Sequence, residues 1–342
     1  MTIETHILDI IEGKQSAPLT KALLNLLSQC YRLGVGLRHF AYDTILPVEK
    51  VPLPVISVGN IVAGGTGKTP FVRYLAERLE SKRKVAILSR GYRRKGEKTL
   101  VVKKETLPEE CGDEPFWLAK VLSQAHVIVG SDRVFAGHLA QRLNAQVILL
   151  DDGMQYRRLD RDIEIGLIHA ADPLGKGFFL PRGFLRDSPK RLSKAHLIVL
   201  TGIKDGNQLT QIEKQIRLYT TAPITVMDII VENQEELASK KVAAFCAIAA
   251  PSRFFQTLKT IGCDPVVIEQ KPDHREFSEK EIEQLSNRAH EKGAECLVCT
   301  EKDAVKLPKN LKIPLPIIPV KISFTPTFGK RHLEKIIQEV SR

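Results

Sequence analysis

The sequence predicts an α/β fold, with a mostly parallel sheet in the main domain and a second, smaller α/β domain after it. A glycine-rich loop stands between an apolar, β-branched run at 55–58 and a periodic helical segment. Short apolar runs then alternate with helical segments, which is typical of a parallel sheet covered by helices. The alternation restarts around Pro223. We therefore expect one domain over residues 1–222 and a smaller one over 223–342.

The glycine-rich loop has the composition of a phosphate-binding loop. Glycines lack a Cβ, so the backbone can turn successive N–H groups toward phosphate oxygens, and the following helix adds its positive end. Lys68 would neutralise the β- and γ-phosphates, and Thr69 would place a hydroxyl at Mg²⁺. A strict motif has glycine five residues before Gly67, where this chain has Val62. The residues expected to contact the nucleotide are Val62, Ala63, Gly64, Gly65, Thr66, Gly67, Lys68 and Thr69.

A glycine-rich turn without a ligand is the alternative for this loop. The Gly-Lys-Thr-Pro sequence in a strand–loop–helix context favours the nucleotide site. Pro70 falls in the first helical turn, where a missing N–H costs little.

Composition describes an ordinary globular chain of 342 residues with 43% apolar residues. No run of 18 or more residues is apolar and free of charge, so we expect no membrane span, and the first residues lack the apolar core of a signal peptide. A cytoplasmic protein is predicted. The six cysteines show no framework spacing, and Cys296 and Cys299 lie in an apolar run, which favours reduced core thiols over metal ligands or a redox pair.

The net charge of +11, from 51 Lys and Arg against 40 Asp and Glu, points to an anionic partner. Nucleic acid is not expected, because the chain has no Cys/His finger, no aromatic RNA-binding strand and only 6% aromatic residues. An anionic membrane surface or a phosphorylated substrate fits better.

Residues 19–42 have the pattern of an amphipathic helix. Apolar side chains recur at intervals of three and four, with basic residues beside them, as in helices that lie in a bilayer interface. Gly34 and Gly36 are expected to break or kink the helix. Packing of this helix against the core of its own domain is the alternative.

Two loops that follow predicted strands carry polar candidates. The run Arg90–Arg94, with Tyr92 inside it, follows the strand at 84–89 and would hold a phosphate or sugar, or be a solvated loop. Asp113 and Glu114 open the helix at 116–122, where a carboxylate serves either as a helix cap or as a general base or metal partner.

A hydrophobic strand at 147–151 ends in the acidic pair Asp151 and Asp152. In a nucleotide-binding fold such a strand places a carboxylate beside the phosphate loop, where it holds Mg²⁺ directly or through water. After the strand at 197–201 the chain lacks the Asn-Lys-x-Asp pattern that reads guanine, so ATP is the expected nucleotide. Between the strands at 163–169 and 197–201, the long basic and apolar loop 173–187 would suit an amphiphilic anion or cover a sheet edge.

The smaller domain is predicted from strand patterns alternating with helix patterns. The expected strands are 241–250, 296–300 and 313–322, and the expected helices are 251–261 and 278–292, the latter capped by Ser278 with Glu281. The pair Asp273-His274 lies in a loop among them. It is either solvated or placed for proton transfer.

Taken together, the motifs resemble the tetraacyldisaccharide 4′-kinase family, whose members phosphorylate the lipid A disaccharide 1-phosphate of Gram-negative bacteria. The similar segments follow one another from residue 57 to residue 306 in the order of the family. They are Gly59-Asn60 with 64–70, Ser89–Tyr92, Gly112–Pro115, Asp151–Gln155, Leu180–Gly183 with Leu185-Arg186, Asp273-His274 and Thr300–Lys306.

The resemblance implies a P-loop NTPase core joined to a smaller α/β domain that closes the active-site cleft. It implies Asp113 as the general base on the 4′-hydroxyl and His274 as its partner. Lys68 and Thr69 would bind phosphate and Mg²⁺. The remaining implied roles are metal binding by Asp151 and Asp152, and positioning of phosphates or substrate by Tyr92, Arg133 and Arg186. Asp187 departs from the family, which often has Glu there.

The implied function is transfer of the γ-phosphate of ATP to the 4′-hydroxyl of tetraacyldisaccharide 1-phosphate, giving lipid IVA. ATP and Mg²⁺ are the implied cofactors, and the anionic lipid and the inner-membrane surface are the implied partners, with no nucleic acid. The helix at 19–42 resembles the family's membrane-associating segment, so a peripheral position on the cytoplasmic face of the inner membrane follows. The alternatives are a dethiobiotin-synthetase-like enzyme on a soluble substrate and a nucleotide-dependent switch without phosphate transfer.

Overall fold

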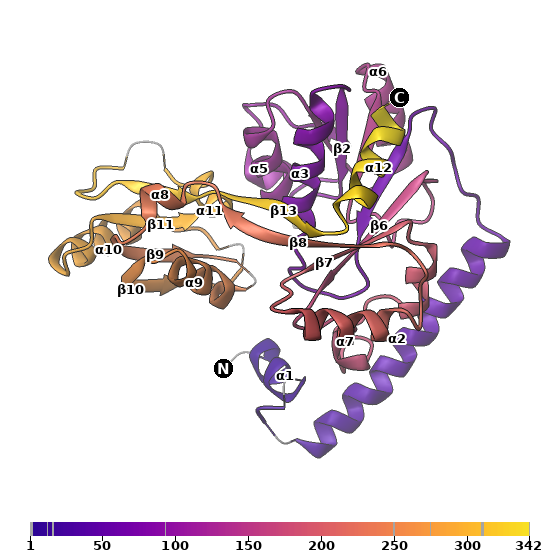
Figure 1. Cartoon of the computed structure of the whole chain (residues 1–342), viewed down its shortest axis with the longest axis horizontal. Coiled ribbons are helices and arrows are strands. Elements are labelled where there is room, and N and C mark those ends of the chain that lie inside the picture. The colour runs from indigo at the N-terminus through magenta and orange to yellow at the C-terminus, as the bar shows by residue number, and fades with distance from the viewer. Residues whose placement is uncertain are drawn as a thin grey trace.

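The computed structural model describes residues 3–11, 13–15, 17–92, 94–248, 250–273, 275–308 and 311–341. Its larger part is a sheet covered by helices, and a smaller α/β unit lies beside it (Figure 1). The predicted α/β fold with a mostly parallel sheet is confirmed.

Nine strands form the large sheet, in the order β13-β8-β7-β6-β1-β5-β2-β4-β3. Only the edge strands β3 and β13 run antiparallel to their neighbours. The strands are β1 (Val55–Gly59), β2 (Val85–Ser89), β3 (Leu100–Val101), β4 (His126–Val129), β5 (Val147–Asp151), β6 (Ile163–His169), β7 (Leu197–Thr201), β8 (Ile224–Val231) and β13 (Ile322–Phe328). Because β1, β2, β5 and β7 are buried along their whole length, they read in the sequence as apolar runs rather than alternating patterns.

Strand β1 lies between β5 and β6 and is parallel to both. Val58 is level with Asp151 at the end of β5. The loop that leaves β1 therefore starts beside the acidic pair that ends β5. This edge of the sheet is where an open α/β sheet places its ligand.

Helices cover both faces of the large sheet. α3 (Lys68–Glu80), α5 (Asp113–Val121) and α12 (Lys330–Ser341) share one apolar core, which contains Phe71, Trp117 and Leu333. On the other face lie α6 (Arg133–Arg142) and α7 (Gly206–Ile216). Short connecting helices are α4 (Pro108–Cys111), η1 (Gly175–Gly177) and η2 (Pro189–Lys194).

The smaller unit is a parallel four-stranded sheet in the order β10-β9-β11-β12. Its strands are β9 (Lys241–Cys246), β10 (Asp264–Gln270), β11 (Cys296–Thr300) and β12 (Ile317–Val320). α9 (Pro251–Thr260) packs on one face and α10 (Glu279–Glu291) on the other. Ser278 caps α10 with Glu281, as expected. The short helices α8 (Gln234–Leu237) and α11 (Glu301–Ala304) complete the unit.

The division expected at residue 223 does not coincide with the sheets. β8 pairs with β7 in the large sheet, and β13 returns to pair with β8, so the small sheet lies between them in the sequence. α12 then packs against α3. The predicted strand at 313–322 is β12 followed by the first residue of β13.

Five of the six cysteines are buried, and only Cys30 is exposed. Cys296 and Cys299 lie in β11 and point into opposite cores, which confirms their prediction as core residues.

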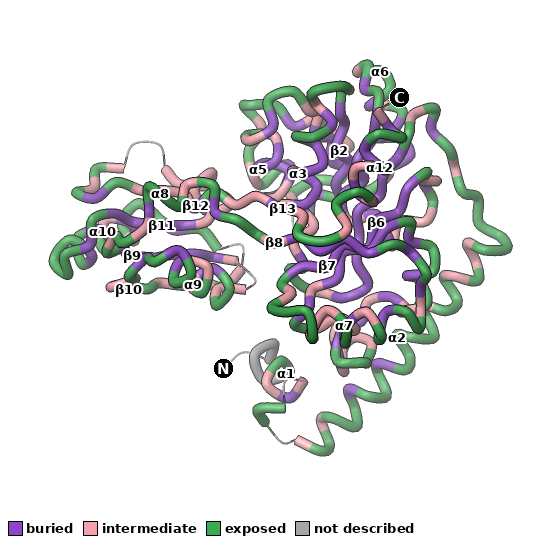
Figure 2. The backbone as a smooth tube through the Cα atoms, viewed as in Figure 1, coloured by how far each residue is buried: buried purple, intermediate pink, exposed green. Residues whose placement is uncertain are grey.

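Helix α2 (Pro18–Thr44) runs without interruption through Gly34 and Gly36, so the expected break is wrong. A glycine inside a helix costs about 1 kcal/mol relative to alanine, which 27 continuous helical residues tolerate. Only Leu24 and Ser28 are buried among the described residues of α2, and exposed positions follow it along most of its length (Figure 2). Ahead of α2 lies α1 (Ile3–Ile11).

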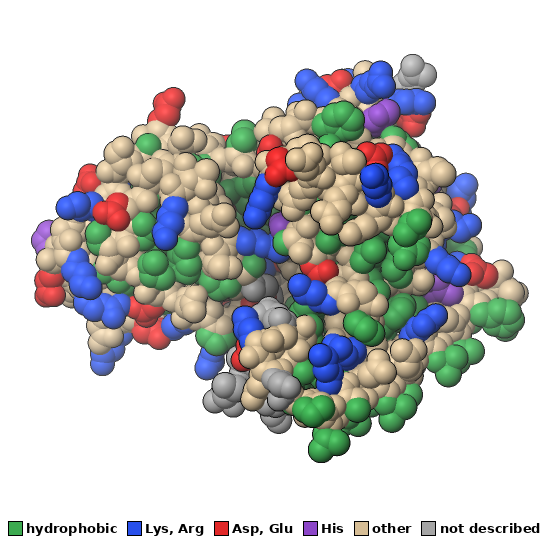
Figure 3. All heavy atoms as spheres, turned by 60° about the horizontal axis from the view of Figure 1, so that its bottom comes forward, with side chains coloured by type: hydrophobic (Ala, Val, Ile, Leu, Met, Phe, Trp, Pro, Cys, Tyr) green, Lys and Arg blue, Asp and Glu red, His purple; other side chains and the backbone are tan. Residues whose placement is uncertain are grey.

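The exposed large apolar side chains of α2 are Leu19, Leu23, Leu26, Leu27, Tyr31, Leu33, Leu37 and Phe40. Green side chains gather at the lower right edge of Figure 3, where this helix runs. Across the described part of the chain, no helix combines the length and the apolarity that a membrane crossing requires.

Candidate active site

The phosphate loop connects β1 to α3. Gly64 and Gly67 have positive φ angles of 108° and 86°, in the region that a side chain disfavours, and Gly67 is the N-cap of α3. A Cβ at Gly64 or Gly65 would meet open space. The loop is therefore shaped by glycine for its backbone conformation, and its outer side is free to receive a ligand.

Several hydrogen bonds fix the loop from inside. Asn60 Nδ2 donates to Thr66 Oγ1 at 2.8 Å, and Ala63 N donates to Phe184 O at 2.7 Å. Val62 forms an isolated antiparallel bridge with Leu185 and is buried in the same apolar cluster. This explains the departure from the strict motif, because the position of Val62 faces the core and not a phosphate. The segment 173–187 thus lies against the phosphate loop.

Lys68 and Asp152 meet at the start of α3. Lys68 Nζ lies 3.6 Å from Asp152 Oδ1, and Arg186 makes a bidentate contact to the same carboxylate, with one donor distance of 2.7 Å. Burial would raise the pKa of Asp152, but Lys68 and Arg186 outweigh it and hold the pKa at about 2. Asp152 is therefore a firmly ionised partner for both cations.

Asp151 has the opposite electrostatics. Burial, with the neighbouring charges of Glu114 and Asp152, raises the pKa of Asp151 to about 7. Ser89 Oγ donates to its Oδ2 at 3.3 Å, whereas its buried Oδ1 has no hydrogen-bond partner among the described residues. A dication beside this oxygen would hold the carboxylate ionised, so the residues fit Mg²⁺.

Thr69 completes the predicted metal set, and it is the second residue of α3, directly after Lys68. In the described ranges no three His, Cys, Asp or Glu side chains converge to hold a metal by themselves. This agrees with the usual binding of Mg²⁺, through one or two carboxylates together with substrate phosphates.

Asp113 is the first residue of α5, and Gly112 is the N-cap. Asp113 is therefore not the N-cap residue itself, and its place in the first turn puts its negative charge at the positive end of the helix. Lys306 Nζ contacts Asp113 Oδ2 at 2.8 Å, and Lys302 Nζ contacts Glu114 Oε1 at 3.0 Å. Both lysines come from the smaller unit. The two acids of α5 are thus held by cations across the boundary between the two sheets.

His274 lies outside the described residues. Its neighbour Asp273 is described and belongs to the same charge cluster. Burial would lower the pKa of Lys302, but Glu114 raises it above its ordinary value, and Asp273 and Asp113 add to that effect. The loop before His274 therefore reaches the cluster that contains Asp113.

Tyr92 and Arg133 flank this group. Tyr92 is 62% exposed, and its carbonyl oxygen lies so close to Gly112 that a Cβ there would approach it to 3.1 Å. Arg133 is buried, with its guanidinium 4.9 Å over the ring of Tyr156. Burial and the charge of Arg90 lower the pKa of Arg133, and Asp152 and Asp151 oppose the shift. Arg133 therefore stands beside the acidic pair without an ion pair to either acid in the described structure.

Asp187 turns away from the acidic pair. His39 Nε2 donates to Asp187 Oδ1 at 2.9 Å, and Gln155 Nε2 lies 3.4 Å from Oδ2. The same Gln155 nitrogen donates to Asn60 O at 2.8 Å. Burial would raise the pKa of Asp187, but the hydrogen bond and charge of His39 lower it. A line of polar contacts therefore joins α2 to the base of the phosphate loop.

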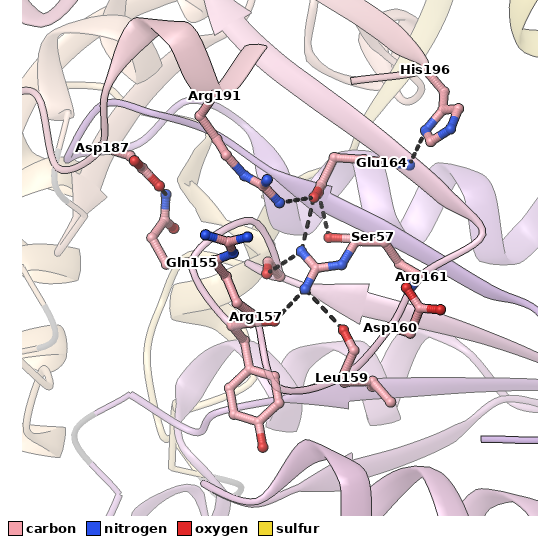
Figure 4. Close-up of polar contacts among 12 residues, drawn as sticks. Ser57, Gln155, Arg157, Leu159, Asp160, Arg161, Glu164, Asp187, Arg191 and His196 are labelled. Atoms are coloured by element: carbon pink, nitrogen blue, oxygen red, sulfur yellow. Dashed lines mark hydrogen bonds and ion pairs between the residues drawn. The ribbon is translucent and has the colours of Figure 1, made fainter. Parts of the chain in front are cut away.

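A buried ionic group supports the segment after Asp152 (Figure 4). Glu164 accepts hydrogen bonds from Ser57 Oγ at 2.6 Å, Arg161 at 2.9 Å and Arg191 at 3.3 Å. Arg161 also donates to the carbonyl oxygens of Gly153 and Leu159. Strands β1 and β6 and the turn after β5 are thus tied together, which fixes the backbone that carries Asp152.

Sequence reasoning gave no role to several side chains that the structure brings to the site. These are Asn60, Gln155, Arg253, Lys302 and Lys306. Arg253, from α9, donates to Gly65 O at 2.7 Å. The signal that was present is the dense run of charges at 301–306, which is unusual directly after a buried strand.

The residue His169, at the end of β6, gives a pH-dependence prediction. Burial, with the charge of Arg253, lowers the pKa of His169 to about 4, and its Nδ1 accepts a hydrogen bond from Ala171 N. An unfolded chain would protonate this histidine below about pH 6.5, so the stability it contributes is present above that pH and is lost as pH falls toward 4. Because the ring is partly solvated, we expect on the order of 1–2 kcal/mol.

Denaturant unfolding at pH 7 and pH 4.5 would measure this effect. His169→Asn should lose less stability than the wild type between these pH values, and exposed His290→Asn is the control. Equal pH dependence of wild type and His169→Asn would contradict the assignment.

The site has the parts of a P-loop phosphotransferase: a glycine loop ahead of a helix, a lysine at the helix start and an acidic pair at the end of the adjacent strand. It is thus a kinase site on an α/β scaffold.

Comparison with known proteins specifies the family. The family model of LpxK, tetraacyldisaccharide-1-P 4′-kinase, matches residues 20–340. The tetraacyldisaccharide 4′-kinase of Syntrophus aciditrophicus is 35% identical, over 91% of both chains. That of Geobacter metallireducens is 37% identical, over 84% of this chain and 89% of its own. LpxK from Aquifex aeolicus, solved in complex with ATP, matches 94% of this chain and 100% of its own with a TM-score of 0.74 and 29% identity. The chain belongs to the tetraacyldisaccharide-1-P 4′-kinase family.

Proposed function

We propose that the protein transfers the γ-phosphate of ATP to the 4′-hydroxyl of tetraacyldisaccharide 1-phosphate, giving lipid IVA in lipid A biosynthesis. The observation that carries the proposal is the placing of Lys68 at the start of α3, Asp151 and Asp152 at the end of β5, and Asp113 at the start of α5, with Lys68 3.6 Å from Asp152. Family membership supports the identity of the acceptor.

In this proposal each residue of the phosphate loop has a simple task. Backbone N–H groups of the glycine loop at 64–67 and the start of α3 bind the β- and γ-phosphates. Lys68 neutralises the charge on the transferring group. Asp152 keeps Lys68 and Arg186 in place through the contacts described above.

Mg²⁺ would be held by Thr69, Asp151 and Asp152, and it supplies charge neutralisation for the ATP phosphates. Arg133, Tyr92 and Arg186 line the approach of phosphates or of the sugar. These assignments are supported by position and charge.

Asp113 accepts the proton of the 4′-hydroxyl, with His274 as its partner. A sugar hydroxyl is a weak acid, so a carboxylate within hydrogen-bond reach contributes as the new bond to phosphorus forms. The contact with Lys306 holds the Asp113 carboxylate in position until the substrate arrives. The smaller unit closes over the site through Arg253, Lys302 and Lys306.

The proposed place of action is the cytoplasmic face of the inner membrane, with α2 lying in the interface. Leu33, Leu37 and Phe40 are each more than 60% exposed, which is unusual for apolar side chains of their size, and they lie on one helix. The net charge of +11 attracts the anionic surface and the anionic lipid acceptor.

A transfer assay tests the proposal directly. Wild-type protein with γ-labelled ATP, Mg²⁺ and the lipid A disaccharide 1-phosphate in detergent micelles should place label in the lipid. ATP binding without label in the lipid would overturn the kinase assignment, and it would redirect the search to soluble acceptors or to a nucleotide switch.

A further inference from the structure

A basic pocket of about 270 Å³ lies between α2 and the chain around η2, apart from the phosphate loop. Five cationic side chains and one carboxylate line it: Arg32, Arg157, Lys190, Arg191, Lys194 and Asp43. Its volume is below the ~300–1,000 Å³ of ordinary small-molecule sites. The pocket is therefore sized for a charged group and not for a whole lipid.

Part of this charge is already neutralised within the protein. Arg157 pairs with Asp43, and Arg191 pairs with Glu164. Arg32, Lys190 and Lys194 have no carboxylate within 4.0 Å in the described part of the chain. Lys194 only contributes, at longer range, to the lowered pKa of Asp43. Three cations are thus available to an anion in the pocket.

Gly36 forms part of the wall and leaves the space open. A Cβ at this position would meet no heavy atom within 4 Å. Residues three and four apart are neighbours on a helix surface, so Gly36 adjoins Arg32 and His39 on one side and Leu33 and Phe40 on the other. Leu33 and Phe40 are 64% and 61% exposed. An anion bound here would lie directly beside the apolar face of α2.

The back of the pocket is closed toward the nucleotide. His39 lines the pocket and donates to Asp187, and Gln155 stands between Asp187 and Asn60. These side chains separate the pocket from the phosphate loop. The anion is therefore a ligand in addition to ATP.

We propose that this pocket binds the phosphate headgroup of an anionic phospholipid from the bilayer in which α2 lies. The apolar face of α2 would enter the acyl region while the pocket, on the flank of the helix, is level with the headgroups. The inference rests on the proposed membrane association and adds a specific headgroup site to it.

Gly36→Leu tests the pocket without changing the net charge. The leucine fills the space and is compatible with the helix, and Gly34→Leu is the matched control because its Cβ also meets no atom within 4 Å and it does not line the pocket. Co-sedimentation would compare vesicles of phosphatidylcholine with vesicles of phosphatidylcholine and phosphatidylglycerol. We expect Gly36→Leu to reduce the preference for phosphatidylglycerol by roughly 5- to 10-fold, with Gly34→Leu unchanged in preference. Circular dichroism would establish that both variants keep their helix content.

The other outcomes separate the possible failures. A preference that Gly36→Leu leaves intact would overturn the pocket, since diffuse charge would then explain it. A raised KM for the lipid substrate in phospholipid-free micelles, with intact vesicle preference, would assign the pocket to the substrate's phosphate and also overturn the proposal. Wild-type protein that binds neither vesicle would overturn the membrane association itself, while the transfer assay in micelles tests the kinase function separately.

Discussion

Replacing Lys68 by alanine is expected to lower phosphate transfer to the lipid by roughly 10²- to 10³-fold or more. Lys68 is the cation at the start of α3, and its ammonium is held 3.6 Å from Asp152, which keeps it in front of the glycine loop. Phosphoryl transfer depends mainly on positioning and charge neutralisation, so the loss of this charge acts on kcat. Label transferred from γ-labelled ATP to the lipid would measure it.

The matched control is Lys82→Ala, which removes an exposed lysine two residues beyond the end of the same helix. Its activity should equal that of the wild type. Lys68→Ala should also fold, because Asp152 keeps its contacts to Arg186. A variant that folds and transfers phosphate at the wild-type rate would show that Lys68 does not contact the transferring group.

Local sequence signals predicted the elements that carry the nucleotide site. The strands β1 and β5 are buried along their whole length and read as apolar runs, and the glycine loop and the acidic pair come directly at their carboxyl ends. Because parallel neighbours bring these ends to the same edge, the contact between Lys68 and Asp152 follows from topology. This part of the site needed no knowledge of distant contacts.

The parts that escaped prediction depend on pairings between segments far apart in the chain. β8 and β13 are separated by about ninety residues, and only their antiparallel pairing shows that both belong to the large sheet. The contacts of Lys302 and Lys306 with the acids of α5 likewise span 188 and 193 residues. The local sequence pattern cannot predict which distant segments pair, although the charged residues themselves are evident in the sequence.

The wrong prediction of a break in helix α2 has a different cause. The low helix propensity of Gly34 and Gly36 indicated a break. Helix propensity contributes little free energy per residue, so two exposed glycines do not interrupt a helix of this length. Polar contacts then fix α2 to the domain, with Ser28 Oγ donating to Phe179 O at 2.8 Å and Tyr31 to Arg186 O at 3.2 Å. Contacts with the rest of the domain therefore stabilise α2 as one continuous helix.

Asp113→Asn is expected to reduce kcat by roughly 10²- to 10⁴-fold, the usual contribution of a general base. The substitution keeps the size of the side chain and an oxygen that can accept from Lys306, so the contact across the two sheets is preserved. The phosphate loop is untouched, so binding of ATP should remain close to that of the wild type. Initial rates of lipid labelling, with ATP binding measured by calorimetry, would separate the two effects.

Glu109→Gln is a suitable control, because it removes an exposed carboxylate from the neighbouring helix α4. It should leave kcat unchanged.

Lys306→Met removes the cation that faces Asp113, and we expect a smaller loss of kcat than for Asp113→Asn, since the lysine acts only through the carboxylate. If Asp113→Asn transferred phosphate at the wild-type rate, the proton acceptor would have to be another group. A nucleotide switch would instead show slow ATP hydrolysis, no label in the lipid and no effect of either substitution, so these variants also distinguish a kinase from a protein that only binds and hydrolyses ATP.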